Sequence, residues 1–461
     1  MKASCIVIGG GLSGLAAAIR LARFIPDVLL LEQHTRLGGL NSYYYRNKTL
    51  FETGLHAITN YAEKGDKRAP LNRLLRQLKL GRSTFDFQQQ KSSEIIFKDL
   101  AALRFSNDFE LLRSEIADTF PDSLAGFDKL CSFLDTFDPF QPGPFRSAKS
   151  FLGERIRDQL LVDMLLCPLM FYGSSVENDM DLSQFAIMFQ AIFREGFFRP
   201  GGTIKDFLHT LSDHLTALGG TIRKGAKVGR IIHRGKTVSG VELTSGEVIE
   251  CDHILSTIGS FETQEIIGQH EPEEKGHRLG FIESIFQLPA TCLDQLPRDR
   301  TVIFFSDSAD FCYQQPEQHV DFTSGVICMP YNFQNVEIGK HFEVRSTHLA
   351  SWQKWLQTRQ DMSRYEEQKR AVRAHSLAVI EQYVGSFGEH VIFEDTFTPI
   401  TIERYTSKKH GAIYGSPAKI KDGDIGFTNL FLAGTDQGFL GIVGSMLSGV
   451  SIVNQHILPN Y

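Results

Sequence analysis

The sequence predicts an α/β fold in which a largely parallel, helix-flanked sheet is interrupted by an α+β second domain. Three observations predict it. A buried strand near the N-terminus runs into a glycine-rich turn and a helix over residues 5–23. A mainly helical block with proline breaks follows at 70–195, and residues 275–335 alternate as in a sheet. Residues 429–457 again have the pattern of strand, glycine-rich loop and helix.

The N-terminal turn has the spacing of a dinucleotide-binding fingerprint on a Rossmann-like fold. A G-x-G-x-x-G run separates strand 5–8 from helix 15–23, and its residues are Gly9, Gly11, Leu12, Ser13 and Gly14. Gly9 permits the turn, Gly11 lets the backbone approach a pyrophosphate, and Gly14 allows close helix packing. The helix N-terminus offers N–H groups to the phosphates. A second strand, 28–31, ends at Glu32, which is predicted to bind both ribose hydroxyls.

The residues after the second strand favour FAD over NAD. An E-x-x-x-R-x-G-G extension begins at Glu32, and its cofactor-contacting residues are predicted to be Gln33, Arg36, Gly38, Gly39, Leu40 and Asn41. The adjacent glycines let the chain pass close to the second phosphate and the ribityl region. An acidic residue at the end of the second strand suits a ribose without a 2′-phosphate. The sequence holds no second G-x-G-x-x-G, so a separate NAD(P)H domain is not expected.

The second half of the same site is predicted far along the chain. Strand 429–433 leads to Gly434 and Asp436, and a glycine-punctuated loop then leads to Gly441, Ile442 and Val443 at a helix start. Asp436 is predicted to bind a ribityl hydroxyl, and the glycines leave room for the flavin ring. Gly54 and His56 follow a strand that ends against the cofactor. His56 is the one candidate catalytic residue, and a histidine bonded to backbone is the alternative.

Length, charge and cysteine content limit the remaining possibilities. We expect an FAD-binding domain from 1–70, 197–262 and 396–461, and a substrate domain with a helical cap from 71–196 and 263–395. The net charge of −6 gives no support for nucleic-acid binding. Seven scattered cysteines without a C-x-x-C pair predict reduced thiols and no metal site. No signal peptide precedes the first strand, so a cytoplasmic protein is expected.

Apolar residues raise the questions of a substrate tunnel and of a membrane. The 36 phenylalanines fit either a greasy tunnel or an ordinary core, and one helical stripe of them is Phe185, Phe189, Phe193 and Phe197. Core packing is the default for this stripe, and a tunnel wall is the alternative. Segment 439–453 is the nearest candidate for a membrane span, but its glycines and serines favour a helix packed against a ligand. Peripheral membrane contact stays open.

The chain resembles the phytoene desaturase, carotenoid isomerase and retinol saturase group of the amine oxidase-like flavoproteins. The resemblance covers nearly the whole length and is carried by F-R-P-G-G at 198–202, T-P-I-T at 398–401 and G-A-I-Y-G at 411–415. It implies non-covalent FAD, Val228 on the strand that contacts the adenine, and a long apolar tunnel for a polyene. Many carotene desaturases carry a proline in the loop after Asp436, which is absent here, so the direction of the redox reaction stays open.

The resemblance leaves three functions open. The first is an FAD-dependent oxidoreductase acting on CH–CH groups of a long conjugated isoprenoid, as a desaturase or a saturase. The second is a redox-neutral cis–trans isomerase of a polyene. The third is an amine or porphyrinogen oxidase on the same fold. The electron partner is oxygen, a quinone or a redox protein, and the oligomeric state stays open.

Overall fold

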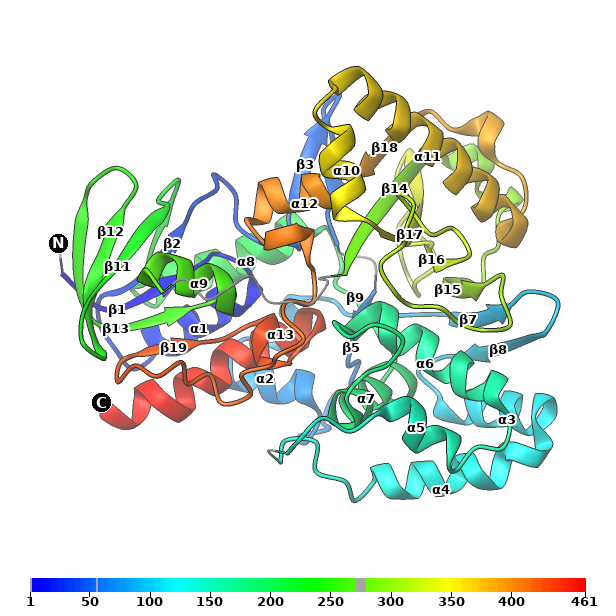
Figure 1. Cartoon of the computed structure of the whole chain (residues 1–461), viewed down its shortest axis with the longest axis horizontal. Coiled ribbons are helices and arrows are strands. Elements are labelled where there is room, and N and C mark those ends of the chain that lie inside the picture. The colour runs from blue at the N-terminus through cyan, green and yellow to red at the C-terminus, as the bar shows by residue number, and fades with distance from the viewer. Residues whose placement is uncertain (1, 55–56, 142, 270–278) are drawn as a thin grey trace.

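The computed structural model describes residues 2–54, 57–141, 143–269 and 279–461. Two large sheets lie side by side, with the first at the left of Figure 1 and the second at the upper right. A group of helices from α3 (Phe109–Thr119) to α7 (Leu182–Phe189) lies below the second sheet. Both chain ends return to the first sheet. The fold is therefore the predicted α/β type with an α+β second part and a helical cap.

The first sheet is built from both ends and the middle of the chain. Its strand order is β10-β2-β1-β13-β12-β11, and β19 also pairs with β13. The strands are β1 (Lys2–Ile8), β2 (Val28–Glu32), β10 (Thr221–Lys224), β11 (Val228–Arg234), β12 (Thr237–Leu243), β13 (Val248–Ser256) and β19 (Leu430–Leu432). Strands β10, β2, β1, β13 and β19 pair in parallel, whereas β11 and β12 are antiparallel additions. Strand β13 is continuous from Val248 to Ser256.

Alternating side chains on β1 bury the two faces of this sheet. Cys5 and Val7 pack with α1 (Leu12–Ala22), α2 (Pro70–Leu78), α8 (Ile204–Ala217) and α13 (Gly441–Ile452). Ile6 and Ile8 pack on the other face with β11–β13 and with the end of α9 (Ser260–Ile267). A strand buried on both faces needs the continuous apolar run that the sequence shows.

The second sheet is mostly antiparallel and has the order β18-β14-β17-β16-β15-β7-β8. Its strands are β7 (Ser92–Phe97), β8 (Ala101–Phe105), β14 (Gly280–Pro289), β15 (Arg300–Ser306), β16 (Ser324–Cys328), β17 (His341–Ala350) and β18 (Phe393–Phe397). Helices α10 (Trp352–Thr358), α11 (Met362–Val384) and α12 (Pro399–Thr406) accompany it. Short pairings complete the strands: the hairpin β3 (Tyr43–Arg46)–β4 (Thr49–Glu52), and β5 (Ile58–Thr59)–β9 (Phe197–Arg199)–β6 (Gln88–Gln89).

The block at 70–195 is less helical than predicted. The hairpin β7–β8 lies within this block and extends the second sheet, so this part of the block is not helical. Two helices, α5 (Ala148–Gly153) and α6 (Gln159–Gly173), follow in this block. The Asp158 side chain accepts a hydrogen bond from the Leu160 N–H at 2.9 Å, and this cap sets the start of α6. The remaining cap helix is α4 (Leu124–Leu134).

The phenylalanine stripe packs in the protein core, and the default expectation from the sequence is therefore confirmed. Phe185, Phe189, Phe193 and Phe197 are at most 1% exposed and belong to one apolar cluster with α6 and β15. Edge-to-face contacts join Phe189 to Phe193 and Phe193 to Phe105. The stripe therefore fixes the cap to the second sheet.

One helical segment, Gly441–Asn460, is long and apolar enough to cross a membrane by length and composition. It is 56% buried and packs against α1, α2 and β5, as buried core helices of this composition do. All seven cysteines lie in the described ranges as free thiols.

Candidate active site

The carboxyl ends of four parallel strands meet at one edge of the first sheet. These strands are β1, β2, β13 and β19, which end at Ile8, Glu32, Ser256 and Leu432. In open α/β sheets, ligands bind in the crevice at this edge. The predicted cofactor residues from both ends of the sequence therefore come together there.

The glycine turn at 9–14 leaves open space beside a helix N-terminus. An added Cβ on Gly11 would meet no atom within 4 Å, whereas one on Gly14 would lie 1.9 Å from the Gly9 carbonyl oxygen. Helix α1 has no side-chain cap and no acidic residue in its first turn. The buried Ser13 hydroxyl finds no hydrogen-bond partner among the described residues. Free helix N–H groups, open space and an unsatisfied hydroxyl fit a bound phosphate.

Glu32 ties the turn to the second strand. Its carboxylate accepts hydrogen bonds from the Gly10 N–H and the His34 N–H, each at 2.7 Å. Gln33 donates to the Ser407 hydroxyl at 2.8 Å. The Ala226 N–H donates to the Glu32 carbonyl, so the chain that enters β11 at Val228 passes beside Glu32. Glu32 therefore orders the turn in addition to any contact with a ribose.

The segment 36–41 lies against the glycine turn. The Gly38 N–H donates to the Gly10 carbonyl at 2.9 Å. A Cβ on Gly39 would lie 3.4 Å from the Gly11 Cα. The Arg36 guanidinium contacts the Tyr43 ring and carbonyl. Leu40 and Asn41 then reach Gly54, because a Cβ there would lie 2.8 Å from the Leu40 carbonyl oxygen.

Asp436 anchors the C-terminal loop. Its carboxylate accepts hydrogen bonds from the Ser260 N–H at 2.6 Å and the Ser416 N–H at 2.7 Å. Burial acts to raise the pKa of Asp436, but Lys408, Lys419 and these two N–H donors outweigh it and lower the pKa. The neighbouring buried hydroxyl of Thr435 has no partner within the described chain. Asp436 thus holds three segments together at the edge of the sheet.

A cavity of about 230 Å³ lies between this edge and the second sheet. One cross-strand row of the second sheet forms its wall: Val326, Thr347, Glu283 and Phe397 stand in register on β16, β17, β14 and β18. The opposite wall comes from the first sheet's loops, and its residues are Leu40, Asn41, Thr53, Gly54, Thr435, Gly441, Ile442 and Ser445. The fold therefore places predicted cofactor residues directly across from a sheet of the other part.

The rest of the cavity lining is aromatic and aliphatic. It comprises Ala57, Thr59, Phe171, Tyr172, Phe281, Ile282, Ile402, Ile413, Tyr414 and Leu440. Glu283 is the one residue with a formal charge that lines the described cavity. Its carboxylate accepts a hydrogen bond from the Arg345 guanidinium at 2.9 Å. Burial raises the pKa of Glu283 to about 7, although Arg345 opposes this shift.

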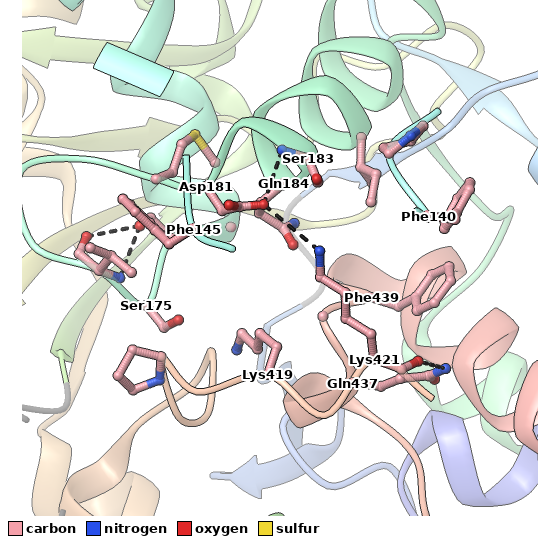
Figure 2. A pocket seen from close by; sticks show the side chains of 18 of the residues that line it. Phe140, Phe145, Ser175, Asp181, Ser183, Gln184, Lys419, Lys421, Gln437 and Phe439 are labelled. Atoms are coloured by element: carbon pink, nitrogen blue, oxygen red, sulfur yellow. Dashed lines mark hydrogen bonds and ion pairs between the residues drawn. The ribbon is translucent and has the colours of Figure 1, made fainter. Parts of the chain in front are cut away.

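A second cavity of about 480 Å³ lies between the cap and the C-terminal loop. Figure 2 shows Phe140, Phe145 and Gln184 on one side of it and Lys419, Lys421 and Phe439 on the other. Neighbouring residues of the chain line the two cavities, since Tyr172 lines the first and Gly173 the second. Likewise, Leu440 lines the first cavity and Phe439 lines the second. The Lys419 ammonium braces this wall by donating to the carbonyls of Tyr414 and Thr435.

The sequence-predicted site residues lie at two places, the glycine turn and the 230 Å³ cavity. Gly9, Gly11, Leu12, Ser13, Gly14 and Gly434 surround the open turn, and Gly441 and Ile442 line the cavity. Val443 is buried in the first turn of α13. His56 lies outside the described residues. Within those residues, no group of three or more His, Cys, Asp or Glu side chains is placed to hold a metal ion.

Comparison with known proteins defines the class. Residues 12–275 match the sequence profile of the flavin containing amine oxidoreductases. Across 91% of this chain and 89% of the relative, 23% of residues are identical to a 4,4'-diaponeurosporene oxygenase of Staphylococcus aureus strain bovine RF122 / ET3-1. The corresponding protein of strain USA300 is 22% identical over the same shares.

Solved structures show the same fold. An oxidoreductase from Methanosarcina mazei superposes with a TM-score of 0.68 at 14% identity, over 98% of this chain and all of the other. Cyclohexylamine oxidase from Brevibacterium oxydans IH-35A superposes with a TM-score of 0.62 at 15% identity, over 100% and 98%. The fold and the site thus define an amine oxidase-like flavoprotein. The chain belongs to the flavin containing amine oxidoreductase family and is a flavin-dependent oxidoreductase with FAD as its cofactor.

Proposed function

We propose that this enzyme oxidises or reduces C–C bonds of a long, apolar, conjugated isoprenoid. The observation that carries the proposal is the chemistry of the 230 Å³ cavity, whose described lining is mostly aromatic and aliphatic, with Glu283 as its one residue with a formal charge. The curated relatives named above are carotenoid-pathway oxygenases, and this supports the same substrate class. An amine oxidase would need a group to hold a cationic amine. Among the described lining residues, Glu283 is the one group that could do so, and for this reason the test below includes amines.

We propose that FAD spans the two halves of the first sheet's edge. Its pyrophosphate lies at Gly11 and the N-terminus of α1, and its adenosine ribose lies beside Glu32. Its flavin end lies near Gly54, Thr435 and Gly441. FAD supplies the two-electron chemistry when bound, and the chain binds it, orients the substrate and excludes water. The domain division at 70, 197, 262 and 396 belongs to this proposal, with one unit for FAD and the other for the substrate.

The 230 Å³ cavity is smaller than the roughly 300–1,000 Å³ of common ligand pockets, so it holds only the reacting segment of a long chain. We propose that the rest of the chain extends toward the 480 Å³ cavity. Two pairs of adjacent residues, Tyr172–Gly173 and Phe439–Leu440, contribute to both cavities and support this route.

The test is anaerobic mixing of the yellow holoenzyme with polyenes and, separately, with primary amines. A polyene is expected to change the redox state of the flavin and to emerge with a longer or shorter chromophore. An isomer shift without any net flavin change would support the isomerase. Reduction by amines, and not by polyenes, would sink the proposal.

We also propose peripheral membrane contact at the 480 Å³ cavity, because a membrane-dissolved substrate would enter through the rim of this cavity. Phe140 and Phe145 line this rim and are 59% and 55% exposed. Replacing both with serine is expected to weaken binding to neutral phospholipid vesicles at least tenfold, because each buried phenylalanine contributes about 1.5–3 kcal/mol. Phe24→Ser is the control, since Phe24 is 54% exposed at the end of α1. Equal vesicle binding by all three proteins would refute the contact.

A further inference from the structure

A buried ionic cluster lies behind the cavity wall. Arg345 is 1% exposed and donates to Glu283 at 2.9 Å, to Glu343 at 2.5 Å and to the Glu52 carbonyl at 2.9 Å. The Glu52 side chain pairs with Arg199 at 2.8 Å. Strands β14, β17, β4 and β9 thus bring together five buried or half-buried charged groups. Such groups need mutual compensation, because burial penalises an unpaired charge.

The cluster contains two arginines and three glutamates, so with every group ionised it carries one net negative charge. Arginine stays protonated, so one proton on a carboxylate would neutralise these five groups. Both oxygens of Glu52 accept hydrogen bonds, from Arg199 and from the Ile204 N–H.

Glu283 and Glu343 differ in what they face. Glu343 accepts two hydrogen bonds from Arg345, at Nε and Nη2, and lines an open groove of about 790 Å³. Glu283 accepts a hydrogen bond from that guanidinium and faces the largely apolar cavity. A drier environment favours the neutral form of a carboxyl group, and burial raises the pKa of Glu283 to about 7. Glu283 is therefore the carboxyl group best placed to exchange a proton, on the substrate side of the cluster.

Among the described residues, the other titratable groups around Glu283 do not compete for this proton. Tyr172 of α6 and Tyr414 of the 411–415 turn are half-buried, Cys328 of β16 is buried, and desolvation raises the pKa of each. They stay neutral through the pH range in which Glu283 titrates. Thr347 and Phe397, which flank Glu283 in register, carry no ionisable group.

We propose that Glu283 is the proton-exchanging group of the cavity and acts on the carbon next to the one that exchanges hydride. The proposal rests on the proposed function. In desaturation, one C–H bond breaks and its hydride passes to FAD. The adjacent C–H bond then breaks, its electron pair forms the C=C bond, and its proton forms an O–H bond on Glu283. Saturation is the reverse: FADH⁻ supplies the hydride and Glu283 supplies the proton.

The ionised form of Glu283 has a second effect in this scheme. Hydride loss leaves positive charge on the conjugated chain, and a carboxylate across the cavity stabilises that charge. Both roles require the Glu283 carboxylate to lie in the cavity wall beside the substrate, opposite the loops of the first sheet.

The test combines two variants with two kinds of readout. Glu283→Gln keeps the shape and an acceptor for Arg345, and it is expected to slow the reaction at least a hundredfold, within the roughly 10²–10⁴-fold range of acid–base catalysis. An infrared pH titration of the protein without FAD should show one carboxyl C=O band that fades near pH 7 and is absent from Glu283→Gln.

Glu343→Gln is the matched variant, because Glu343 pairs with the same arginine, Arg345. It removes one negative charge, so it is expected to move the infrared midpoint and the half-maximal pH of the reaction together toward lower pH. A purely structural Glu283 would change stability and leave the pH profile in place. Unchanged turnover in Glu283→Gln, or a midpoint that does not respond to Glu343→Gln, overturns the proposal. If polyenes fail to react with the wild type, the proposed function fails, and the infrared titration still decides whether Glu283 carries the proton.

Discussion

Gly11→Val is expected to yield a folded protein that no longer retains FAD. Gly11 has an extended backbone with φ −71° and ψ 178°, which valine adopts readily, and an added Cβ meets no atom within 4 Å. The space that receives this side chain is the space that the pyrophosphate would occupy. We expect affinity for FAD to fall at least a hundredfold, which corresponds to about 2.7 kcal/mol. Flavin fluorescence titration of the apoprotein measures this.

Two further variants separate cofactor loss from misfolding. Gly14→Ala places a Cβ 1.9 Å from the Gly9 carbonyl oxygen, so it is expected to destabilise the fold itself. Gly339→Val has as much free space as Gly11→Val but lies on the open groove, and it should bind FAD normally. A Gly11→Val protein that is purified yellow with unchanged affinity would show that the phosphates lie elsewhere.

Arg345→Met is expected to have the largest effect on stability. The substitution leaves Glu283 and Glu343 without the cation that compensates them, in a region where Arg345 is 1% exposed. Removing one partner from a buried ion pair costs about 3–5 kcal/mol. Chemical denaturation of the apoprotein, followed by circular dichroism, measures the loss in the free energy of unfolding.

The double variant Arg345→Met/Glu343→Gln should recover part of that loss, because it removes a carboxylate that Arg345→Met leaves without its cation. The pH dependence has a defined sign. The pKa of folded Glu283 is raised from 4.5 to about 7, so its contribution to stability is full below pH 4.5 and is lost as pH rises through 7. Glu283→Gln should remove this slope. If Arg345→Met is as stable as the wild type, Arg345 does not compensate the buried carboxylates of the cluster.

The FAD cofactor was predictable because its sequence signals are local, whereas the residues predicted to contact it stay a prediction. The turn at Gly9 to Gly14 and the acidic end of β2 need only strand, glycine and helix in sequence order. The pairing with the loop from Gly434 to Gly441 also followed, since both segments have the same strand–loop–helix pattern. The role of Asp436 was predicted less completely. The pattern indicates a polar contact at a strand end, but not that Ser260 and Ser416 both bind this carboxylate.

The substrate half was not predictable from local pattern. Glu283 and Arg345 lie in strands that alternate like any half-buried strand, and only the register of β14 on β17 shows that they meet. Charged residues in alternating strands are ordinarily taken as facing solvent. The hairpin β7–β8 was missed although Ser92–Phe97 alternates in burial, because helical patterns on both sides dominated the interpretation. Its turn contains Asp99 with φ 60°, a conformation that aspartate tolerates.

The central claim is that an apolar polyene, rather than an amine, reacts at the cavity between Gly441 and Glu283. Its most direct test is anaerobic spectrophotometry of the flavin in the holoenzyme. We predict that a desaturation substrate bleaches the oxidised flavin, or that a saturation substrate restores the yellow colour of the reduced flavin. In either case the polyene absorption shifts in step. A flavin that responds to primary amines and ignores every polyene would contradict the account.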